Sequence, residues 1–379
     1  MANFIGQLRP NEIFATLFNM IISIQTFADP HSGGYRELVT QFKADGSMYG
    51  DTKLYVSTDI LETHEWLGDA EATNLLSLDR PPDPKTQSIV LDKFRQIRLT
   101  TDNYLSKRAW GSADAFAQFN SVMQSWIRTT KEIFDELTVN VYTGTKEADS
   151  ATMSITITLP QDANNQEAEN RLQAQAIAYA MEEIFDEIRD ISADFNDNGF
   201  TRSYSPDEMM IVWNASVKNR ILKIDLPSLF HSDIFENLTE MKLPARYFGT
   251  VNTTSGTTSA TNVTATSGQV RSLIETDYTV ANQGADARAK LKNGAWVVHV
   301  RPADLLPNST AYDADTTYTQ DEDILFKVVT KKSIIYMSAF ETGTEFFNPR
   351  SLTKNDYLTF GYANPEYLKE FPLVTVRAA

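Results

Sequence analysis

The chain has 379 residues, of which 42% are hydrophobic and 22% charged, an ordinary composition for a folded protein of about two domains. Its formal net charge of −16 argues against a surface that binds nucleic acid, because phosphates are neutralised by Lys and Arg. The sequence contains no cysteine, which excludes disulfides, thiol catalysis and cysteine-based metal centres and favours folding in a reducing cytoplasm.

A helix is expected near the start of the chain, over residues 10–24. Pro10 is a favoured first-turn residue, and apolar side chains follow it at the spacing of one helix face. These side chains are Ile13, Leu17, Met20, Ile21 and Ile24. The run is shorter than the roughly 20 residues that span a bilayer, and no basic cluster precedes it, so a targeting segment is not favoured.

A long hairpin is expected next. Apolar residues recur with a period of about two over 53–61 and 88–100. This pattern predicts two paired strands that project roughly 30 Å. Residues 79–84 include three prolines and predict an exposed, stiff turn between the strands. A two-stranded ribbon is marginal alone in water, so we expect it to lie on a neighbouring copy of the chain. The apolar side chains expected to be buried there are Leu54, Val56, Trp66, Ile89 and Leu91.

A long helix is predicted to follow the hairpin, from an N-cap at Ser112 to about Leu137. Its length would be roughly 35 to 40 Å. Apolar residues follow the three- and four-residue spacing of one buried face. They are Phe116, Phe119, Val122, Met123, Trp126, Ile127, Ile133, Phe134 and Leu137.

A half-buried strand is predicted over 151–159, before Pro160, and a second long helix over 165–193. The buried side of this helix is expected to carry Leu172, Ala176, Tyr179, Ile184, Ile188 and Ile191. The other side carries an acidic run that is typical of a solvated face rather than a catalytic cluster. The acidic residues are Glu182, Glu183, Asp186, Glu187 and Asp190.

The remaining segments alternate strands with turns and one helix. We expect a turn feeding a buried strand over 206–214, and a helix over 231–242. Residues 251–268 are rich in Ser, Thr, Gly and Asn and predict a surface loop. Further strands are expected over 295–301, 323–336 and 373–377.

No catalytic, cofactor-binding or metal-binding residue is assigned from the sequence. Asp194, Asn196 and Gly199 match the opening of an EF-hand calcium loop, but its twelfth position is Ser205, where a bidentate Glu is required. The Asn198–Gly199 pair fits equally well as the left-handed end of the preceding helix. The four histidines are scattered, and an enzyme working through two carboxylates stays open. The histidines are His31, His64, His231 and His299.

The order of these elements resembles the major capsid proteins of tailed bacteriophages, an α+β family with the Hong Kong 97-like fold. The implied parts are an N-terminal arm, an extended hairpin loop, a peripheral domain with a spine helix and the second long helix, an axial domain with a Ser/Thr-rich insertion, and a return to the peripheral domain. In order they span residues 1–45, 46–100, 101–200, 201–318 with the insertion at 251–268, and 319–379. The turn Asn348-Pro349-Arg350 before an aromatic strand is also similar to the C-terminal region of some capsid proteins of small short-tailed phages.

The resemblance implies a head protein, not an enzyme, that self-assembles as pentamers and hexamers into an icosahedral shell. Such a shell encloses DNA without sequence-specific binding, for which an acidic wall is suited, and uses no cofactor and no membrane. The arm before the hairpin is too short to hold a cleavable scaffold, which implies a separate scaffolding protein beside a portal. The protein would be made in the host cytoplasm and reside in the virion. The alternatives are an acidic soluble carbohydrate-directed enzyme or binding protein, and an encapsulin-like compartment shell.

Overall fold

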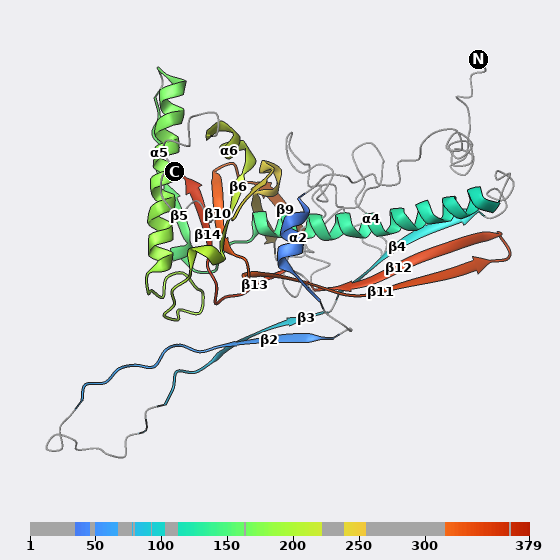
Figure 1. The fold of residues 1–379 in the computed structure, drawn as a ribbon, viewed down its shortest axis with the longest axis horizontal. Helices are drawn as coiled ribbons and strands as arrows, with labels where there is room; N and C mark the ends of the chain where they lie inside the picture. Colours follow the sequence, from blue (N-terminus) through green and yellow to red (C-terminus); the bar gives the residue numbers. More distant parts are fainter. Residues whose placement is uncertain are drawn as a thin grey trace.

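The computed structural model describes most of the chain as two sheets, two long helices and a projecting ribbon (Figure 1). The described residues are 35–45, 50–66, 78, 80–91, 93–102, 113–162, 164–221, 239–254, 315–363 and 365–379. The predicted helix over 10–24 and strand over 295–301 lie outside these ranges. The mixture of helix and sheet agrees with the predicted α+β class.

The first sheet is long, and the long helix α4 (Ala113–Thr145) runs beside it (Figure 1). Its order is β1-β11-β12-β4, and the short strand β13 also pairs with β11. The phenyl rings of Phe134 on α4 and Phe360 on β12 lie 5.6 Å apart, which places the helix against the sheet. The bounds are β1 Lys43–Asp45, β4 Lys93–Asp102, β11 Ile334–Asn348, β12 Thr353–Tyr362 and β13 Glu366–Tyr367.

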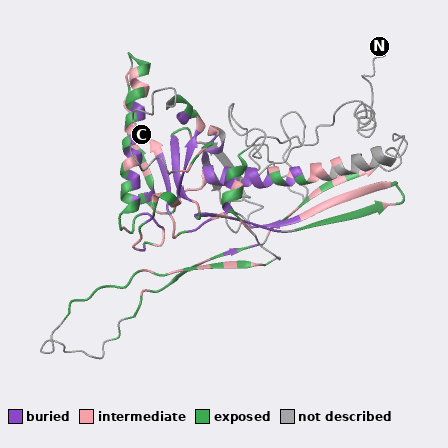
Figure 2. Cartoon of the chain, viewed as in Figure 1, coloured by how far each residue is buried: buried purple, intermediate pink, exposed green. Residues whose placement is uncertain are grey.

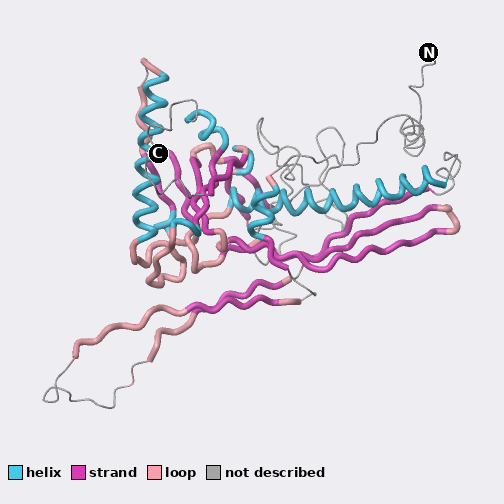
Figure 3. The backbone as a smooth tube through the Cα atoms, viewed as in Figure 1, coloured by secondary structure: helices cyan, strands magenta, loops and turns pink. Residues whose placement is uncertain are grey.

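The second sheet has the order β5-β14-β10-β6-β7, and the helices α5 and α6 pack beside it (Figure 3). Its central strands are buried along their whole length, as the apolar runs in the sequence predict. The strands are β5 Ser154–Ile157, β6 Met209–Asn214, β7 Thr239–Leu243, β10 Ile324–Thr330 and β14 Leu373–Ala378. The helices are α5 Gln166–Arg189 and α6 Ala215–Ile221.

Three further short elements are one helix and one pair of strands. The helix α2 (Arg36–Phe42) buries Leu38 and Phe42 in the same core as Phe134 of α4. The strands β8 (Gly249–Thr254) and β9 (Asp315–Gln320) form a separate antiparallel pair.

The hairpin exists, but its strands differ from the prediction. The ladder joins β2 (Thr52–Ser57) to β3 (Lys85–Val90). The predicted returning strand 88–100 is two strands, because β4 pairs with β12 in the first sheet instead of continuing the ribbon. The prolines at 81, 82 and 84 lead directly into β3 rather than forming the turn of the hairpin. Since proline cannot donate to a ladder, they coincide with its end.

The helix α4 runs to Thr145, eight residues beyond the predicted end at Leu137. Residues 138–145 include five β-branched side chains and one glycine, which disfavour helix locally. They are helical because Val139, Val141 and Tyr142 are buried in the core of the first sheet. The hydroxyl of Thr138 also donates to the carbonyl of Phe134 at 2.8 Å. Tertiary burial therefore overrides local preference at this end of the helix.

The buried face of α4 is confirmed only in part. Phe134 and Leu137 are buried, whereas Trp126 and Ile127 are half-buried. The side chains of Phe116, Phe119 and Met123 lie outside the described residues.

The helix α5 begins after Asn165, whose side chain accepts hydrogen bonds from the amides of Glu167 and Ala168, as its predicted start requires. Its buried face agrees with the prediction at Ile184 and Ile188 and differs at other positions. Leu172 and Tyr179 are exposed, because they lie off the face that packs against the sheet. Ile191 is exposed and lies beyond the helix, which ends at Arg189 rather than at the predicted residue 193. The buried face carries Ala174, Ile177, Met181, Ile184, Phe185 and Ile188. The acidic run lies largely on the exposed side, as predicted.

Three further predictions are corrected by the strand pairing. Residues 239–242, predicted to be helical, belong to β7, which runs parallel to β6 and takes its conformation from that ladder. Residues 251–254 of the predicted loop belong to β8. Residues 151–153 form a 3-10 turn, so the predicted strand over 151–159 begins only at Ser154. The strands predicted over 206–214, 323–336 and 373–377 correspond to β6, to β10 with the start of β11, and to β14.

The predicted domain boundaries at 200/201 and 318/319 do not separate the two sheets. The second sheet takes β5 from one side of the first boundary and β6 from the other. It also takes β10 and β14 from beyond the second boundary. Hydrogen bonding between strands distant in sequence decides this division, which element order alone does not reveal.

Candidate assembly surface

The projecting hairpin exposes more large apolar side chains than any other described element. Its arms extend past the ladder on both sides, over 58–66 and 80–84, and Figure 2 shows them largely exposed. Trp66 is 88% exposed and Leu54 is 63% exposed. An apolar set on one projection marks an interaction surface, because soluble monomers rarely leave such sets uncovered. The members are Leu54, Val56, Ile60, Leu61, Trp66 and Leu78.

The base of the hairpin is instead buried within the chain's own body. Ile89 and Leu91 are 1% and 0% exposed and pack with Met337 and Leu368 in a small core. The amide of Gly50, whose φ is 82°, donates to the carbonyl of Leu91 at 2.9 Å. The expectation that Ile89 and Leu91 await a neighbouring copy is therefore wrong. Leu54, Val56 and Trp66 remain exposed in the single chain, as expected.

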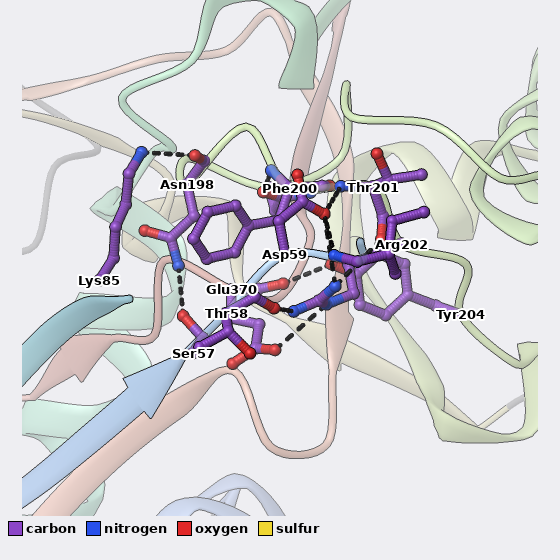
Figure 4. Close-up of polar contacts among 12 residues, drawn as sticks. Ser57, Thr58, Asp59, Lys85, Asn198, Phe200, Thr201, Arg202, Tyr204 and Glu370 are labelled. Atoms are coloured by element: carbon purple, nitrogen blue, oxygen red, sulfur yellow. Dashed lines mark hydrogen bonds and ion pairs between the residues drawn. The ribbon is translucent and has the colours of Figure 1, made fainter. Parts of the chain in front are cut away.

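Where the ladder ends, polar groups of the hairpin contact the loop after α5 and the loop before β14 (Figure 4). The amide group of Asn198 donates to the Ser57 hydroxyl at 3.1 Å. The ammonium group of Lys85 donates to the carbonyl of Asn198. The amide of Thr201 donates to a carboxylate oxygen of Asp59 at 2.9 Å.

Arg202 lies at the centre of this set (Figure 4). Its Nη2 donates to the carbonyl of Thr58, and its Nη1 lies 3.8 Å from Oδ1 of Asp59. Its Nε donates to Oε1 of Glu370 at 3.3 Å. We call these contacts the polar clamp, and it is formed by Ser57, Thr58, Asp59, Lys85, Asn198, Thr201, Arg202 and Glu370.

In a second projection, an ionic network joins α4 to the first sheet, and its members Lys131 and Asp135 are buried. Nζ of Lys131 lies 2.7 Å from Asp135 and 2.9 Å from Glu341. The hydroxyl of Tyr336 donates to Asp135 at 2.8 Å. Burial acts to lower the pKa of Lys131, but the two carboxylates outweigh it and raise that pKa. Burial, with the charge of Asp135, raises the pKa of Tyr336 well above its usual value.

The two sheets meet at the end of α4, where Lys327 of β10 is completely buried. Its Nζ donates to the carbonyl of Lys146 at 2.7 Å, directly after the last residue of the helix. Burial lowers the pKa of Lys327 to about 7. Arg377 pairs nearby with Asp321 at 3.3 Å and with Glu147. Charged groups therefore surround the junction between the two sheets.

The candidate calcium loop serves a structural role within the chain. The side chain of Asn196 donates to the Phe200 carbonyl at 2.7 Å and accepts from the Phe200 amide at 2.8 Å. The carboxylate of Asp197 accepts from the amide of Ser150 at 2.9 Å. The alternative reading of Gly199 as the end of the helix is wrong, because α5 ends at Arg189.

Chemistry-bearing residues do not converge elsewhere in the described ranges. Within them, no group of three His, Asp or Glu side chains is placed to hold a metal ion. His64 is exposed on a hairpin arm, and His31, His231 and His299 lie outside the described residues. Of the described helices, none is long and apolar enough to cross a membrane. The sequence does not predict the polar clamp, because Arg202 and Asp59 lie far apart in the chain and belong to no motif.

Comparison with known proteins identifies what the chain is similar to. The sequence model of the family described as Phi29-like phage major capsid protein matches residues 7–362. No curated protein sequence matches significantly. A chain in the capsid structure of Staphylococcus phage Andhra aligns with a TM-score of 0.59 at 11% identity, covering 94% of this chain and 87% of that one. A chain in the structure of the head fiber and inner core protein gp22 of native bacteriophage P68 aligns with a TM-score of 0.57 at 11% identity, covering 99% and 90%. At such identity the two alignments establish similarity of fold.

Proposed function

The chain belongs to the family of Phi29-like phage major capsid proteins, and from this premise we propose how its surfaces build a phage head. It is a head-shell protein that assembles from many copies of itself and resides in the virion capsid. Its mixed fold of helix and sheet is similar to that of phage capsid structures. The proposal concerns the division of the fold, the contacts between copies, and the other components of the head.

The fold is of the Hong Kong 97-like type, with residues 1–45 as the N-terminal arm and 46–100 as the extended loop. The peripheral domain consists of α4, its spine helix, and the sheet β1-β11-β12-β4. The axial domain consists of the second sheet with α5 and α6, so it draws on segments from 101–200 and 319–379 as well as from 201–318. Two projections on opposite sides of the body support this division (Figure 1).

The exposed apolar side chains of the hairpin are the observation that carries the assembly proposal. The two arms extend beyond the ladder and have no sheet partner in the described chain, so their burial requires another molecule. In a shell of identical subunits that molecule is a neighbouring copy. A contact between unlike surfaces of two copies closes into rings, which suits pentamers and hexamers of an icosahedral shell.

The remaining components follow from the same role. A separate scaffolding protein and a portal complete assembly, and the protein is made in the host cytoplasm. The shell encloses the DNA genome without specific binding, for which the net charge of −16 is suited, because an acidic wall repels phosphates. It acts as a structural protein, not an enzyme. A carbohydrate-directed enzyme or binding protein and an encapsulin-like compartment are not favoured by the family match.

Particle formation tests the proposed function directly. The full chain, purified alone and with the scaffolding protein of the same phage, is examined by sedimentation velocity and negative-stain microscopy. We expect closed shells of megadalton mass built from many copies. A chain that stays monomeric under every assembly condition, with scaffold present, would overturn the proposal.

A further inference from the structure

The hairpin is held to its own subunit at several points along its length. In the middle of β3, the side chain of Gln87 donates to the carbonyl of Tyr367 at 2.8 Å and accepts from the amide of Lys369 at 3.1 Å. The inner attachment, at Ile89 and Leu91, is apolar and completely buried. The outer attachment, the polar clamp, lies at the end of the ladder, where Ser57 pairs with Lys85. Beyond Asp59 the described residues of the arms are exposed, except the half-buried Pro82. The polar clamp is therefore the outermost described contact between the hairpin and the body, and it determines the direction in which the arms leave.

The body side of the polar clamp is itself firmly fixed. The loop after α5 is closed by reciprocal backbone hydrogen bonds between Ser192 and Arg202, at 3.0 and 2.9 Å. The amide of Tyr204 donates to the carbonyl of Ile188, at 3.1 Å, in the last turn of α5. The Tyr204 hydroxyl donates to the carbonyl of Glu370, which joins this loop to the loop before β14. The two loops lead into β6 and β14, which are strands of the second sheet. The polar clamp therefore fixes the direction of the hairpin relative to that sheet.

The polar clamp is also accessible to water. The side chains of Arg202, Asp59 and Glu370 are 21%, 24% and 34% exposed. A crevice of about 410 Å³ lies beside them, lined in part by Ser57, Lys85 and Asn198. Partly exposed ionic contacts contribute little to global stability and are weakened by salt. The polar clamp can therefore open while the buried inner attachment and the fold persist.

From this geometry we propose that Arg202 is a positioning residue for assembly. Through Thr58 and Asp59 it holds the hairpin in one direction before any neighbouring copy is met. This inference rests on the proposed function, because it assumes that the hairpin is the part that reaches a neighbour. Fixing the direction in advance reduces the conformational entropy lost when two copies join, so it speeds assembly without adding a contact between them.

The test measures the direction of the hairpin in the unassembled subunit. The chain has no cysteine, so two introduced residues, Glu62→Cys on the arm and Glu183→Cys on α5, take spin labels at known positions. Pulsed electron spin resonance then gives the distribution of distances between hairpin and body. We expect a narrow distribution in the labelled wild type and a broad one with Arg202→Met. With Arg202→Lys, which keeps the charge but not the planar fork, we expect an intermediate width.

Hydrogen exchange gives an independent measure on the same subunits. The amide of Thr201 donates to the carboxylate of Asp59, and Asp59→Asn replaces this charged acceptor by a neutral one, so the weaker hydrogen bond should let this amide exchange about tenfold faster. The matched control is Lys332→Met, which removes an exposed ion pair with Glu208, 2.8 Å long, that is not part of the polar clamp. It should change neither the distance distribution nor this exchange rate.

The outcomes separate the positioning role from the proposed function. A distribution as narrow in Arg202→Met and Asp59→Asn as in the wild type would overturn the inference, and so would a broad distribution in the wild type. If circular dichroism shows that Arg202→Met is unfolded, the width of the distance distribution in Asp59→Asn, a change on the hairpin side of the polar clamp, tests the inference instead. Shells that form at the wild-type rate despite a broadened distribution would overturn the positioning role. A wild type that forms no shells overturns the proposed function, and the spin-label result still decides whether Arg202 directs the hairpin.

Discussion

Replacing Lys327 by Met should flatten the pH dependence of the subunit's stability. Burial lowers the pKa of Lys327 from 10.5 to about 7 in the folded chain. Between these values the unfolded chain binds a proton that the folded chain lacks, so the free energy of unfolding rises as the pH increases from about 7 to 10.5. The destabilisation is fully present below pH 7 and absent above 10.5. The Lys327→Met variant has no such group and should lack this part of the slope.

The size of the effect follows from the size of the pKa displacement. A shift of this extent corresponds to a free energy on the order of 5 kcal/mol, a large share of the roughly 5 to 15 kcal/mol that stabilises a domain. The hydrogen bond from Lys327 to the Lys146 carbonyl offsets part of it, by about 1 to 3 kcal/mol, in the wild type only. The absolute stability of the variant is therefore less informative than its slope with pH.

The assay is urea unfolding of unassembled subunits, followed by tryptophan fluorescence at about pH 6 and about pH 10. The difference in unfolding free energy between wild type and Lys327→Met should change by several kcal/mol between these pH values. Lys332→Met, at an exposed lysine, is the control and should follow the wild type. Parallel stability curves for wild type and Lys327→Met would refute the reasoning, since they would mean that Lys327 keeps its ordinary pKa when buried.

Other predictions concern the spine helix and the hairpin. Phe134→Ala should lower the free energy of unfolding by about 3 to 5 kcal/mol, and Trp126→Ala should lower it less, because Phe134 is buried and Trp126 is half-buried. Urea unfolding measures both variants, and equal losses would contradict the burial pattern. Charge reversal on the exposed return arm, Arg80→Glu with Asp83→Lys, should leave circular dichroism unchanged and reduce shell formation in sedimentation velocity; wild-type yields of shells would count against an interfacial arm. Leu54→Ser should likewise spare folding and weaken assembly, whereas an unfolded variant would place Leu54 in the subunit's own core.

The sequence by itself determined the elements whose signal is local. Apolar alternation predicts β2, a continuous apolar run predicts β6, and a long helix is predicted where α5 lies. The order of a hairpin followed by a long helix also led to the capsid family that the family match establishes. These signals survive because a hydrophobic pattern depends on residues within a few positions of one another.

Only the tertiary structure decided how distant segments combine. The split of 88–100 into β3 and β4 follows from the pairing of β4 with β12, more than 250 residues away. The burial of Ile89 and the exposure of Tyr179 depend on which face meets another element, a choice that a single apolar pattern leaves open. The polar clamp joins Asp59, Arg202 and Glu370 through contacts between side chains without a spacing rule. Such contacts leave no periodic trace in the sequence, because their geometry is produced by the fold as a whole.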